Sequence, residues 1–497
     1  MIRSPRPAGL ARYGNQRTLA LACVVTLLCG CTVGPNFHEP MPPRADGYLA
    51  PAPQTATASA SDQQVVLGET LQRDWWRLFQ SDALDEVVRR ALAGNRTLTE
   101  AAATLAQAQE LVAAQSGHRY PQLGVTAGIG GQKYGAEFLG SLTKPPPFTY
   151  YAIGPSISYS FDYLGGVARS VEQREALAEY QRQQLDAAYL AVTGNAVIES
   201  LRIALLQEEI ATVEAILDED RQNQQLVRTA YEAGSVARVD TVSAESQLAS
   251  DTTLLPPLKQ ELSVARHALA IVLGEAPAQE LPPDLELSKL ALPQHLPVSL
   301  PSELAHRRPD ILATEAQLHA ATAAVGVATA NLYPHIDLTA STGLQSTVLG
   351  HLFDGSSSVY GIAGSLVAPL LDGGTLRAEK RAAVDALKAS SAHYEQTVLV
   401  AFGQVADSLQ ALDHDAEQLD AQAHAQSAAR ENVDLTRRSY NEGNVGVLQV
   451  LDAERLYQNA RLGYVRAQAQ RYLDTVQLFL ALGGSGPDVA VPTARAQ

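Results

Sequence analysis

The organisation of this chain is decided by two similar stretches, Tyr120-Pro-Gln-Leu-Gly-Val-Thr-Ala-Gly-Ile-Gly130 and Tyr333-Pro-His-Ile-Asp-Leu-Thr-Ala-Ser341. In both, apolar side chains alternate with polar or small ones after a Tyr-Pro pair, which is the pattern of a β-strand with one apolar face. A second run follows each stretch, and it alternates less cleanly in the second half of the chain. The sequence therefore predicts two β-hairpins, over about residues 121–163 and 334–371.

These stretches belong to a repeat that covers most of the chain. Glycine, tyrosine, alanine and glutamate landmarks recur in the same order in both halves. They are Gly165-Gly166 and Gly373-Gly374, Tyr231-x-x-Gly234 and Tyr440-x-x-Gly443, Ala244-Glu245 and Ala453-Glu454, and Leu273-Gly274 and Leu482-Gly483. The offsets of all these landmarks lie between 208 and 213 residues. Chance matches would not keep one register, so we infer an internal duplication.

Long helical patterns precede and follow the hairpins. Leu and Val recur at spacings of three and four. The predicted helices cover about residues 82–116, 167–233, 237–272, 376–442 and 445–482. A helix of roughly 65 residues extends close to 100 Å, so the predicted fold class is mainly α. The long helices should turn back at Gly234 and Gly443, and Pro256-Pro257 should interrupt the first returning helix because proline lacks a backbone donor.

Four strands cannot close a membrane barrel. Alternation of apolar with small or polar residues over about ten positions is the signature of a transmembrane β-barrel, and the alternative is two edge hairpins on a soluble domain. The smallest closed barrels have about eight strands, and an open edge in lipid leaves backbone groups unpaired. Membrane insertion would therefore require a dimer with eight strands or a trimer with twelve.

The N-terminus predicts export and lipid attachment. An arginine-bearing segment precedes an apolar run of about twelve residues, too short to span a bilayer, so residues 1–30 read as a signal peptide. The end of this run, Leu28-Cys29-Gly30-Cys31, resembles a bacterial lipobox, which implies acylation of Cys31. Because Thr32 follows rather than Asp, the resemblance implies sorting to the outer membrane. Residues 31–75 are then a lipidated tether, held by several acyl chains.

Composition and motifs argue against other functions. The formal net charge of −16 disfavours binding to nucleic acid. We find no His-Glu-x-x-His spacing, phosphate-binding loop or nucleophile elbow, so we expect no enzyme, no cofactor and no metal site. Asp413-His414-Asp415 is interpreted as a solvated helix face. Because all three cysteines lie at or before Cys31, the rest of the chain can form no internal disulfide.

Several motifs resemble the lipoprotein branch, of OprM and NodT type, of the TolC-like outer membrane factors. They are Cys31-Thr-Val-Gly-Pro35-Asn-Phe37-His-Glu-Pro40, Trp75-Trp76-Arg-Leu-Phe79, His306-Arg307-Arg308-Pro309-Asp310-Ile311 with Glu315, Asn331-Leu-Tyr333-Pro334, and Tyr440-Asn-Glu-Gly443 leading to Val450-Leu451-Asp452-Ala453-Glu454-Arg455. From the residues themselves, the Arg-Arg-Pro-Asp run reads as structural, with Pro309 opening a helix and Asp310 in its first turn.

The resemblance implies a homotrimer with a twelve-stranded barrel in the outer membrane and a helical tunnel in the periplasm. Such a protein is the exit duct of a tripartite efflux pump for small molecules, working with a periplasmic adaptor and an inner-membrane transporter. The alternatives are the outer-membrane component of type I secretion, or a periplasmic coiled-coil scaffold without a channel. The two repeats would cover residues 76–280 and 300–484, followed by a tail of 485–497. The sequence does not identify the cargo.

The resemblance also implies a gate and docking tips. It places Leu448, Asp452 and Arg455 at the periplasmic constriction: the leucine narrows the pore, the aspartate forms a threefold ring, and the arginine pairs with acids of a neighbouring helix. Gln449 stands where TolC has a second aspartate, which weakens the case for cation binding. The alternative is a solvated coiled-coil face. The turns at Gly234 and Gly443 would contact the adaptor, or be plain turns.

Overall fold

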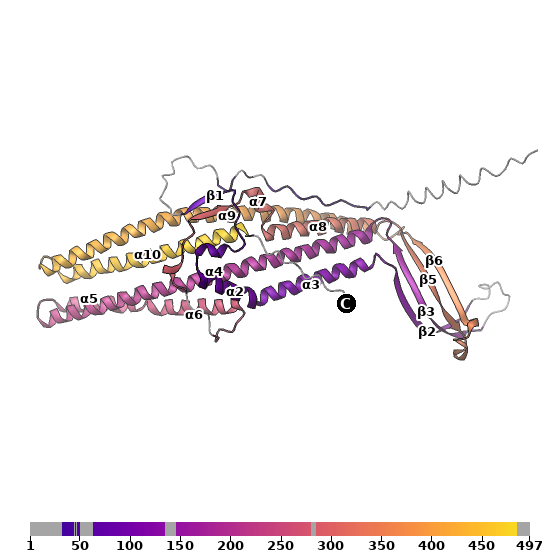
Figure 1. The fold of residues 1–497 in the computed structure, drawn as a ribbon, viewed down its shortest axis with the longest axis horizontal. Coiled ribbons are helices and arrows are strands. Elements are labelled where there is room, and N and C mark those ends of the chain that lie inside the picture. Colours follow the sequence, from indigo (N-terminus) through magenta and orange to yellow (C-terminus); the bar gives the residue numbers. More distant parts are fainter. Residues whose placement is uncertain are drawn as a thin grey trace, which may run out of the picture. The chain divides into compact units, whose positions relative to one another are not determined.

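The structure is a computed structural model that describes residues 32–43, 45, 47–49, 63–134, 146–279 and 285–484. The chain divides into two compact units, and both halves of the repeat contribute to each (Figure 1). The first unit combines Met1–Pro40, Ala106–Tyr180 and Glu315–His393, and the second combines Met41–Leu105, Gln181–Thr314 and Tyr394–Gln497. Cys31, the signal peptide and the tail from residue 485 lie outside the described residues.

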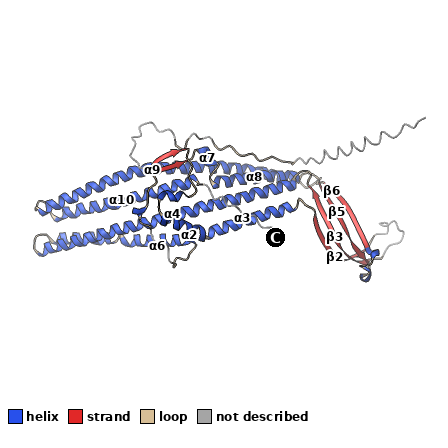
Figure 2. Ribbon diagram, in the orientation of Figure 1, coloured by secondary structure: helices blue, strands red, loops and turns tan. Residues whose placement is uncertain are grey.

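The first unit contains a four-stranded antiparallel sheet (Figure 2). Its strands are β2 (Gln122–Gln132), β3 (Phe148–Phe161), β5 (His335–Ser346) and β6 (Ser358–Val367), in the order β2-β3-β5-β6. The two predicted hairpins are confirmed, and they pair through β3 and β5. The last strand ends four residues before the predicted limit of 371, where Pro369 cannot donate to a ladder.

Cross-strand register brings the alternating apolar residues onto one face of this sheet. Leu123 pairs with Ile157, and Ile336 pairs with both Phe161 and Leu366. These side chains do not cover a core, since Leu123 is 71% exposed and Leu366 is 67% exposed. An apolar face left open to the surroundings is expected for strands that contact lipid.

Helices continue directly from the strands of the first unit. Here α3 (Arg96–Gly117) precedes β2, α4 (Gly166–Glu232) follows β3, α8 (Pro309–Ala330) precedes β5, and α9 (Thr375–Asn441) follows β6. The Asp162 carboxylate accepts a hydrogen bond from the Ala168 N–H at 2.9 Å, which caps the first turn of α4. Two short 3-10 helices, η3 (Leu349–His351) and η4 (Gly355–Ser357), join β5 to β6.

The second unit is helical. It contains the distal parts of α4 and α9 with α2 (Asp82–Gly94), α5 (Arg238–Thr252), α6 (Leu255–Leu273), α7 (Pro301–Ala305) and α10 (Val447–Leu482). The interruption predicted at Pro256-Pro257 is confirmed, because α5 ends at Thr252 and α6 begins with these prolines in its first turn. Its repeat counterpart α10, which has no proline, continues without a break.

The prediction of a single helix over residues 82–116 is wrong, because the structure has two helices there, α2 and α3. Asn95 separates α2 from α3, and its side-chain oxygen accepts hydrogen bonds from the N–H groups of Thr97 (2.9 Å) and Leu98 (3.2 Å). The Asn95 amide also donates to the Val272 carbonyl at 2.7 Å, which fixes the break against α6. An asparagine that caps a helix is not distinguished by hydrophobic period from one within it.

The core of the second unit also includes a small parallel sheet that the sequence did not predict. Strand β1 (Gln64–Leu67) pairs with β4 (His295–Val298) across more than 200 residues of chain. Beside it, Trp75 and Phe79 of η1 (Trp75–Phe79) pack on Phe479, and all three are almost fully buried. A further 3-10 helix, η2 (Leu287–Lys289), precedes β4. Four-residue strands carry too little alternation to be predicted from sequence.

Candidate gate and docking tips

The two helical turns named as docking tips have the same backbone geometry. Gly234 lies in the turn between α4 and α5 and has a φ of 75°. Gly443 lies in the turn between α9 and α10 and has a φ of 78°. The Gly234 N–H donates to Tyr231 O at 2.8 Å, and the Gly443 N–H donates to Tyr440 O at 2.9 Å. A left-handed residue at this position suits glycine, which explains why the glycine of the Tyr-x-x-Gly motif recurs.

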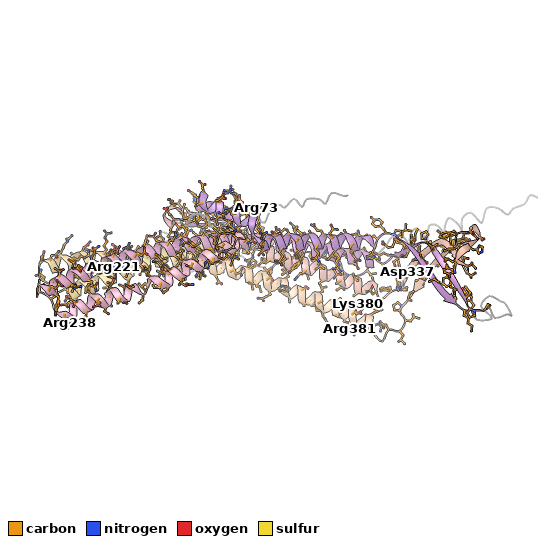
Figure 3. The ribbon with its side chains drawn as sticks, turned by 90° about the horizontal axis from the view of Figure 1, so that it is seen from below. Arg73, Arg221, Arg238, Asp337, Lys380 and Arg381 are labelled. Carbon is orange, nitrogen blue, oxygen red and sulfur yellow. The ribbon has the colours of Figure 1, made fainter. Side chains whose placement is uncertain are left out.

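The tips pack together around a small apolar cluster of Val227, Ala244 and Val447. A groove of about 630 Å³ lies beside this cluster, and residues of both turns line it, including Ser235, Tyr440, Val445 and Leu448. Arg221 and Arg238 lie near this end of the helices (Figure 3).

The three proposed gate residues lie on one exposed face at the start of α10. Leu448 is 44% exposed. Arg455 pairs with Asp452 of its own helix at 2.5 Å, and their side chains are 54% and 60% exposed. Within the chain, Arg455 therefore meets its own aspartate rather than an acid of a neighbouring helix. An exposed face suits both a pore lining and a solvated coiled coil, so the gate stays a prediction.

The structure adds a buried seam between α4 and α10, which we call the Glu454 seam, comprising Asn223, Arg437 and Glu454. The Glu454 carboxylate accepts hydrogen bonds from Arg437 Nε at 2.9 Å and from the Asn223 amide. Only 7% of its side chain is exposed. Burial raises the pKa of Glu454, although the Arg437 guanidinium partly opposes this. The seam holds the second-repeat helices against the first-repeat helix α4.

A carboxylate lies one turn further along the same interface. Asp220 of α4 accepts a hydrogen bond from the Gln458 amide at 3.0 Å. Burial, followed by the nearby Asp251 and Glu454 carboxylates, raises the pKa of Asp220 to about 6. Sequence inspection missed this interface because Asn223, Glu454 and Gln458 look like ordinary polar positions on amphipathic helices. A signal was present in the repeat, because Asn223, Arg437 and Glu454 each have a counterpart of the same residue type 209 positions away.

The Arg-Arg-Pro-Asp run is structural, as predicted. Helix α8 begins at Pro309 with Asp310 in its first turn. Arg308 is 7% exposed and donates to the Ala481 carbonyl at 2.8 Å and to Gln404 at 2.7 Å. Arg308 therefore joins the start of α8 to the end of α10 and to α9, whereas Arg307 is exposed.

The interpretation of Asp413-His414-Asp415 as a solvated face is wrong for Asp415. This residue is 8% exposed, and one of its carboxylate oxygens has no hydrogen-bond partner. Burial, followed by the neighbouring Asp474 carboxyl, raises the pKa of Asp415 to about 7, while Arg471 opposes the shift. Among the residues that the structure describes, no group of three or more His, Cys, Asp or Glu side chains is placed to hold a metal ion.

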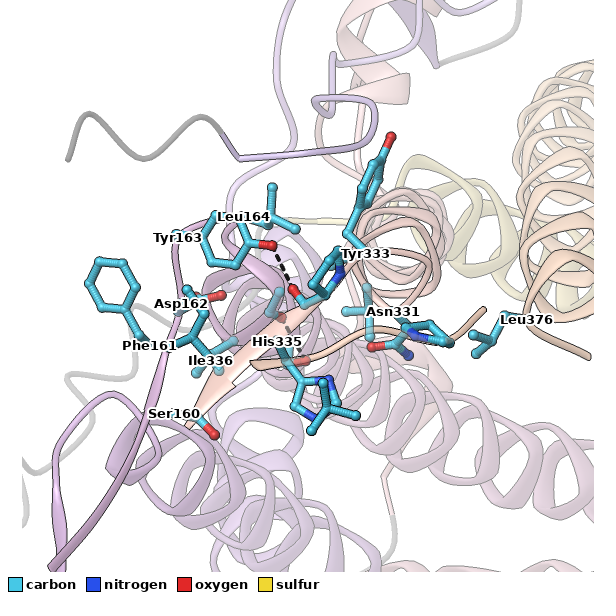
Figure 4. Close-up of a pocket in the computed structure, with 18 residues that line it drawn as sticks. Ser160, Phe161, Asp162, Tyr163, Leu164, Asn331, Tyr333, His335, Ile336 and Leu376 are labelled. Carbon is cyan, nitrogen blue, oxygen red and sulfur yellow. Dashed lines mark hydrogen bonds between the residues drawn. The ribbon is translucent and has the colours of Figure 1, made fainter. Parts of the chain in front are cut away.

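A mainly apolar cavity of about 540 Å³ lies where strands become helices in the first unit (Figure 4). The Tyr163 hydroxyl donates to the Pro334 carbonyl at 2.6 Å and joins the β3–α4 turn to the start of β5. Leu376 at the start of α9 also lines the cavity.

Comparison with known proteins identifies relatives over nearly the full length. The profile of the family described as "Outer membrane efflux protein" matches residues 87–275 and 300–484. Pyoverdine export outer membrane protein OpmQ of Pseudomonas aeruginosa is 30% identical over 477 residues, which covers 94% of this chain and 96% of that protein. Outer membrane protein OprJ of the same species is 29% identical, with coverage of 93% and 95%.

Solved structures give the same result. The outer-membrane channel OprN superposes with a TM-score of 0.83 and 28% identity, covering 92% of this chain and 99% of OprN. The open state of the MtrE outer membrane channel of Neisseria gonorrhoeae superposes with a TM-score of 0.76 and 27% identity, covering 91% and 98%. The mainly helical fold with a β-barrel region, expected from the sequence, is confirmed.

Proposed function

Because this chain belongs to the outer membrane efflux protein family, it is an outer-membrane exit duct that extends into the periplasm, and we propose that it works as a homotrimer with a periplasmic adaptor and an inner-membrane transporter. The cargo we propose is a small molecule, as in the pyoverdine export named for OpmQ. The protein then carries cargo through its pore without catalysing a reaction.

The observation that supports oligomerisation is the sheet with two open edges. Each outer strand, β2 and β6, has one described partner, and Ile362 of β6 is 83% exposed. Unpaired edges cannot remain in lipid, so β6 of one copy must pair with β2 of the next. Two copies would supply eight strands and three copies twelve, and either number can close a barrel. Membership of the outer membrane efflux protein family favours the trimer.

The repeat predicts the register of this pairing between copies. The two hairpins align through equivalent pairs, Ile157 with Leu123 in the first and Leu366 with Ile336 in the second. By the same alignment Ala127 is the counterpart of Ala340, and Ile157 pairs with Ala340 within the chain. We therefore expect Leu366 to face Ala127 of the next copy, which keeps both side chains on the apolar face.

Disulfide trapping tests this register. The mature chain has no cysteine after Cys31, so introduced pairs report without background. The variant Leu366→Cys with Ala127→Cys should give covalent trimers on oxidation. Leu366→Cys with Gly131→Cys, four residues out of register and roughly 13 Å away, should not. Cross-linking of the Leu366→Cys, Gly131→Cys control alone would contradict the proposed register. Wild-type protein that forms neither trimers nor ion-conducting channels in planar bilayers would contradict the function as an exit duct.

The internal repeat also supports a contact between copies in the helical tunnel. The residues found 209 positions from the Glu454 seam are identical in type: Asn432 for Asn223, Glu245 for Glu454, and Arg228 for Arg437. Within one chain Glu245 is exposed, and Arg228 pairs with Glu232. We infer that Glu245 accepts a hydrogen bond from Asn432 of the next copy, as Glu454 does from Asn223 within the chain.

The remaining assignments complete the proposal. Leu448, Asp452 and Arg455 form the periplasmic gate, and the turns at Gly234 and Gly443 receive the adaptor. Cys31 carries the lipid anchor after removal of residues 1–30. The chain is then organised as an N-terminal tether over 31–75, repeats over 76–280 and 300–484, and a tail over 485–497. Type I secretion of a protein is the alternative, and the export named for OpmQ favours a small molecule.

A further inference from the structure

The first residues after the lipidation position are held against the protein rather than free. We call residues 32–37 the strap. The Val33 N–H donates to the Leu164 carbonyl at 3.0 Å, in the turn between β3 and α4. In the same turn Gly165 has φ of 72°, and a Cβ added there would lie 2.6 Å from the Thr32 methyl carbon. The start of the strap therefore packs directly on this turn.

The strap also contacts α8 through its backbone. Gly34 has φ of 92°, and a Cβ added to it would lie 2.5 Å from the Gly326 Cα. A side chain at position 34 would collide with this backbone, so the approach requires glycine there. A Cβ added to Gly326 would instead lie 2.8 Å from Arg169 Cγ. Three residues further on, the Phe37 ring stacks on the His319 ring of α8, with centroids 4.3 Å apart.

Arg169 of α4 clamps the strap in place. This arginine is 4% exposed, and it donates from Nε to the Val33 carbonyl at 3.2 Å and from Nη2 to the Asn36 side chain at 2.6 Å. Its Nη1 pairs with Glu172 at 2.7 Å, and Glu172 in turn contacts His319 at 3.0 Å. A buried guanidinium is unfavourable unless its donors are paired, and the strap supplies two of the three partners of Arg169.

We propose that Arg169 and the strap hold the lipid of Cys31 at the β3–α4 turn, so that the anchor sets the height at which the hairpins enter the membrane. This inference rests on the lipidation of Cys31 proposed above. Consecutive Cα atoms are about 3.8 Å apart, so the lipid leaves the chain within one residue of the turn. A free tether of the predicted 31–75 length would instead range over roughly 35–40 Å and set no height. The surface that the anchor meets is the periplasm-facing phospholipid leaflet.

An insertion experiment distinguishes a lipid anchor held at the β3–α4 turn from one on a flexible tether. A flexible Gly/Ser segment of about twelve residues, with a reach of roughly 20 Å, is placed between Cys31 and Thr32 and begins with Thr to keep the sorting signal. The matched control carries the same segment between Ala56 and Thr57. The comparison variant is Cys31→Ala behind a cleavable signal peptide of a non-lipoprotein. The measurement is the rate at which detergent-resistant trimers appear in the outer membrane of cells after a pulse label.

We expect the insertion after Cys31 to slow trimer formation at least fivefold, as far as Cys31→Ala does, and the control insertion to leave it unchanged. If the variant with the insertion after Cys31 forms trimers at the wild-type rate while Cys31→Ala forms them slowly, the lipid acts only as a flexible tether and the proposal is overturned. Wild-type assembly by Cys31→Ala overturns it equally. Channel conductance of the trimers that do form tests the duct separately.

The clamp itself is tested by hydrogen–deuterium exchange of purified trimers. Arg169→Leu should raise exchange of the Val33 amide at least tenfold, whereas Arg174→Leu, at an exposed position on the same helix, should not. Asn36→Ala removes one contact and should raise exchange less, with the fold intact. Unchanged protection in both Arg169→Leu and Asn36→Ala would show that neither contact holds the strap.

Discussion

Removal of the Glu454 carboxylate should favour the open state of the periplasmic end. In the structure the Glu454 carboxylate accepts hydrogen bonds from Arg437 of α9 and from Asn223 of the first-repeat helix α4. It therefore links α10 to both helices. If the gate opens by movement of the second-repeat helices, the α4–α10 link must break. The variant Glu454→Ala breaks it in advance.

The magnitude follows from the burial and the contacts. A hydrogen bond to a charged group contributes about 1.5–3 kcal/mol to stability. Glu454 accepts hydrogen bonds from two residues, Arg437 and Asn223. Two effects reduce the total: the carboxylate has a desolvation cost, seen in its raised pKa, and half-exposed Arg437 regains water when its partner is lost. We estimate a net loss of about 2 kcal/mol per chain, which is roughly a thirtyfold change in the closed-to-open ratio for each chain.

The assay is conductance of single trimers in planar bilayers at pH 7.5. Glu454→Ala should raise the fraction of time in high-conductance states, and Asn223→Ala should do so less, since it removes one contact. The matched control is Glu431→Ala, at an exposed position on α9. Equal conductance of Glu454→Ala and wild type, with trimers intact, would refute the role of the seam. An effect of Glu431→Ala as large as that of Glu454→Ala would refute its locality.

Three further results are expected. Replacement Asp452→Ala should raise the closed-channel conductance by removing a ring of charge, and unchanged conductance would remove Asp452 from the gate. Arg308→Met should lower the free energy of unfolding by about 3 kcal/mol, because the buried Ala481 carbonyl loses its donor, whereas exposed Arg307→Ala should change it by less than about 0.5 kcal/mol in denaturant titrations. The pKa of Asp415, about 7 when folded and ordinarily 3.8, implies stability that is complete below about pH 4 and lost as the pH rises through 7. Asp415→Asn should therefore melt higher than wild type at pH 8 and show a smaller gap at pH 5, and a gap that does not change with pH would contradict this titration.

Local pattern was enough to locate the long elements. A period of two and a period of 3.6 are properties of neighbouring residues, so the hairpins and the helices that turn at Gly234 and Gly443 could be predicted without knowledge of the fold. The repeat added the barrel argument, because unpaired edges follow from the strand count. The break at Pro256-Pro257 was equally local, since a missing N–H acts within its own helix.

Contacts distant in the sequence were decided only by tertiary structure. The burial of Glu454 depends on Asn223, which is 231 positions away along the chain. Asp415, on a stretch that looks solvated, is buried because Asp474 and Arg471 of α10 pack against it. The strap shows the same dependence: Arg169 resembles any surface arginine until Val33 and Asn36 lie against it. Hydrophobic period reports which face of a helix is apolar, but the partner of a polar side chain depends on which distant segment packs there.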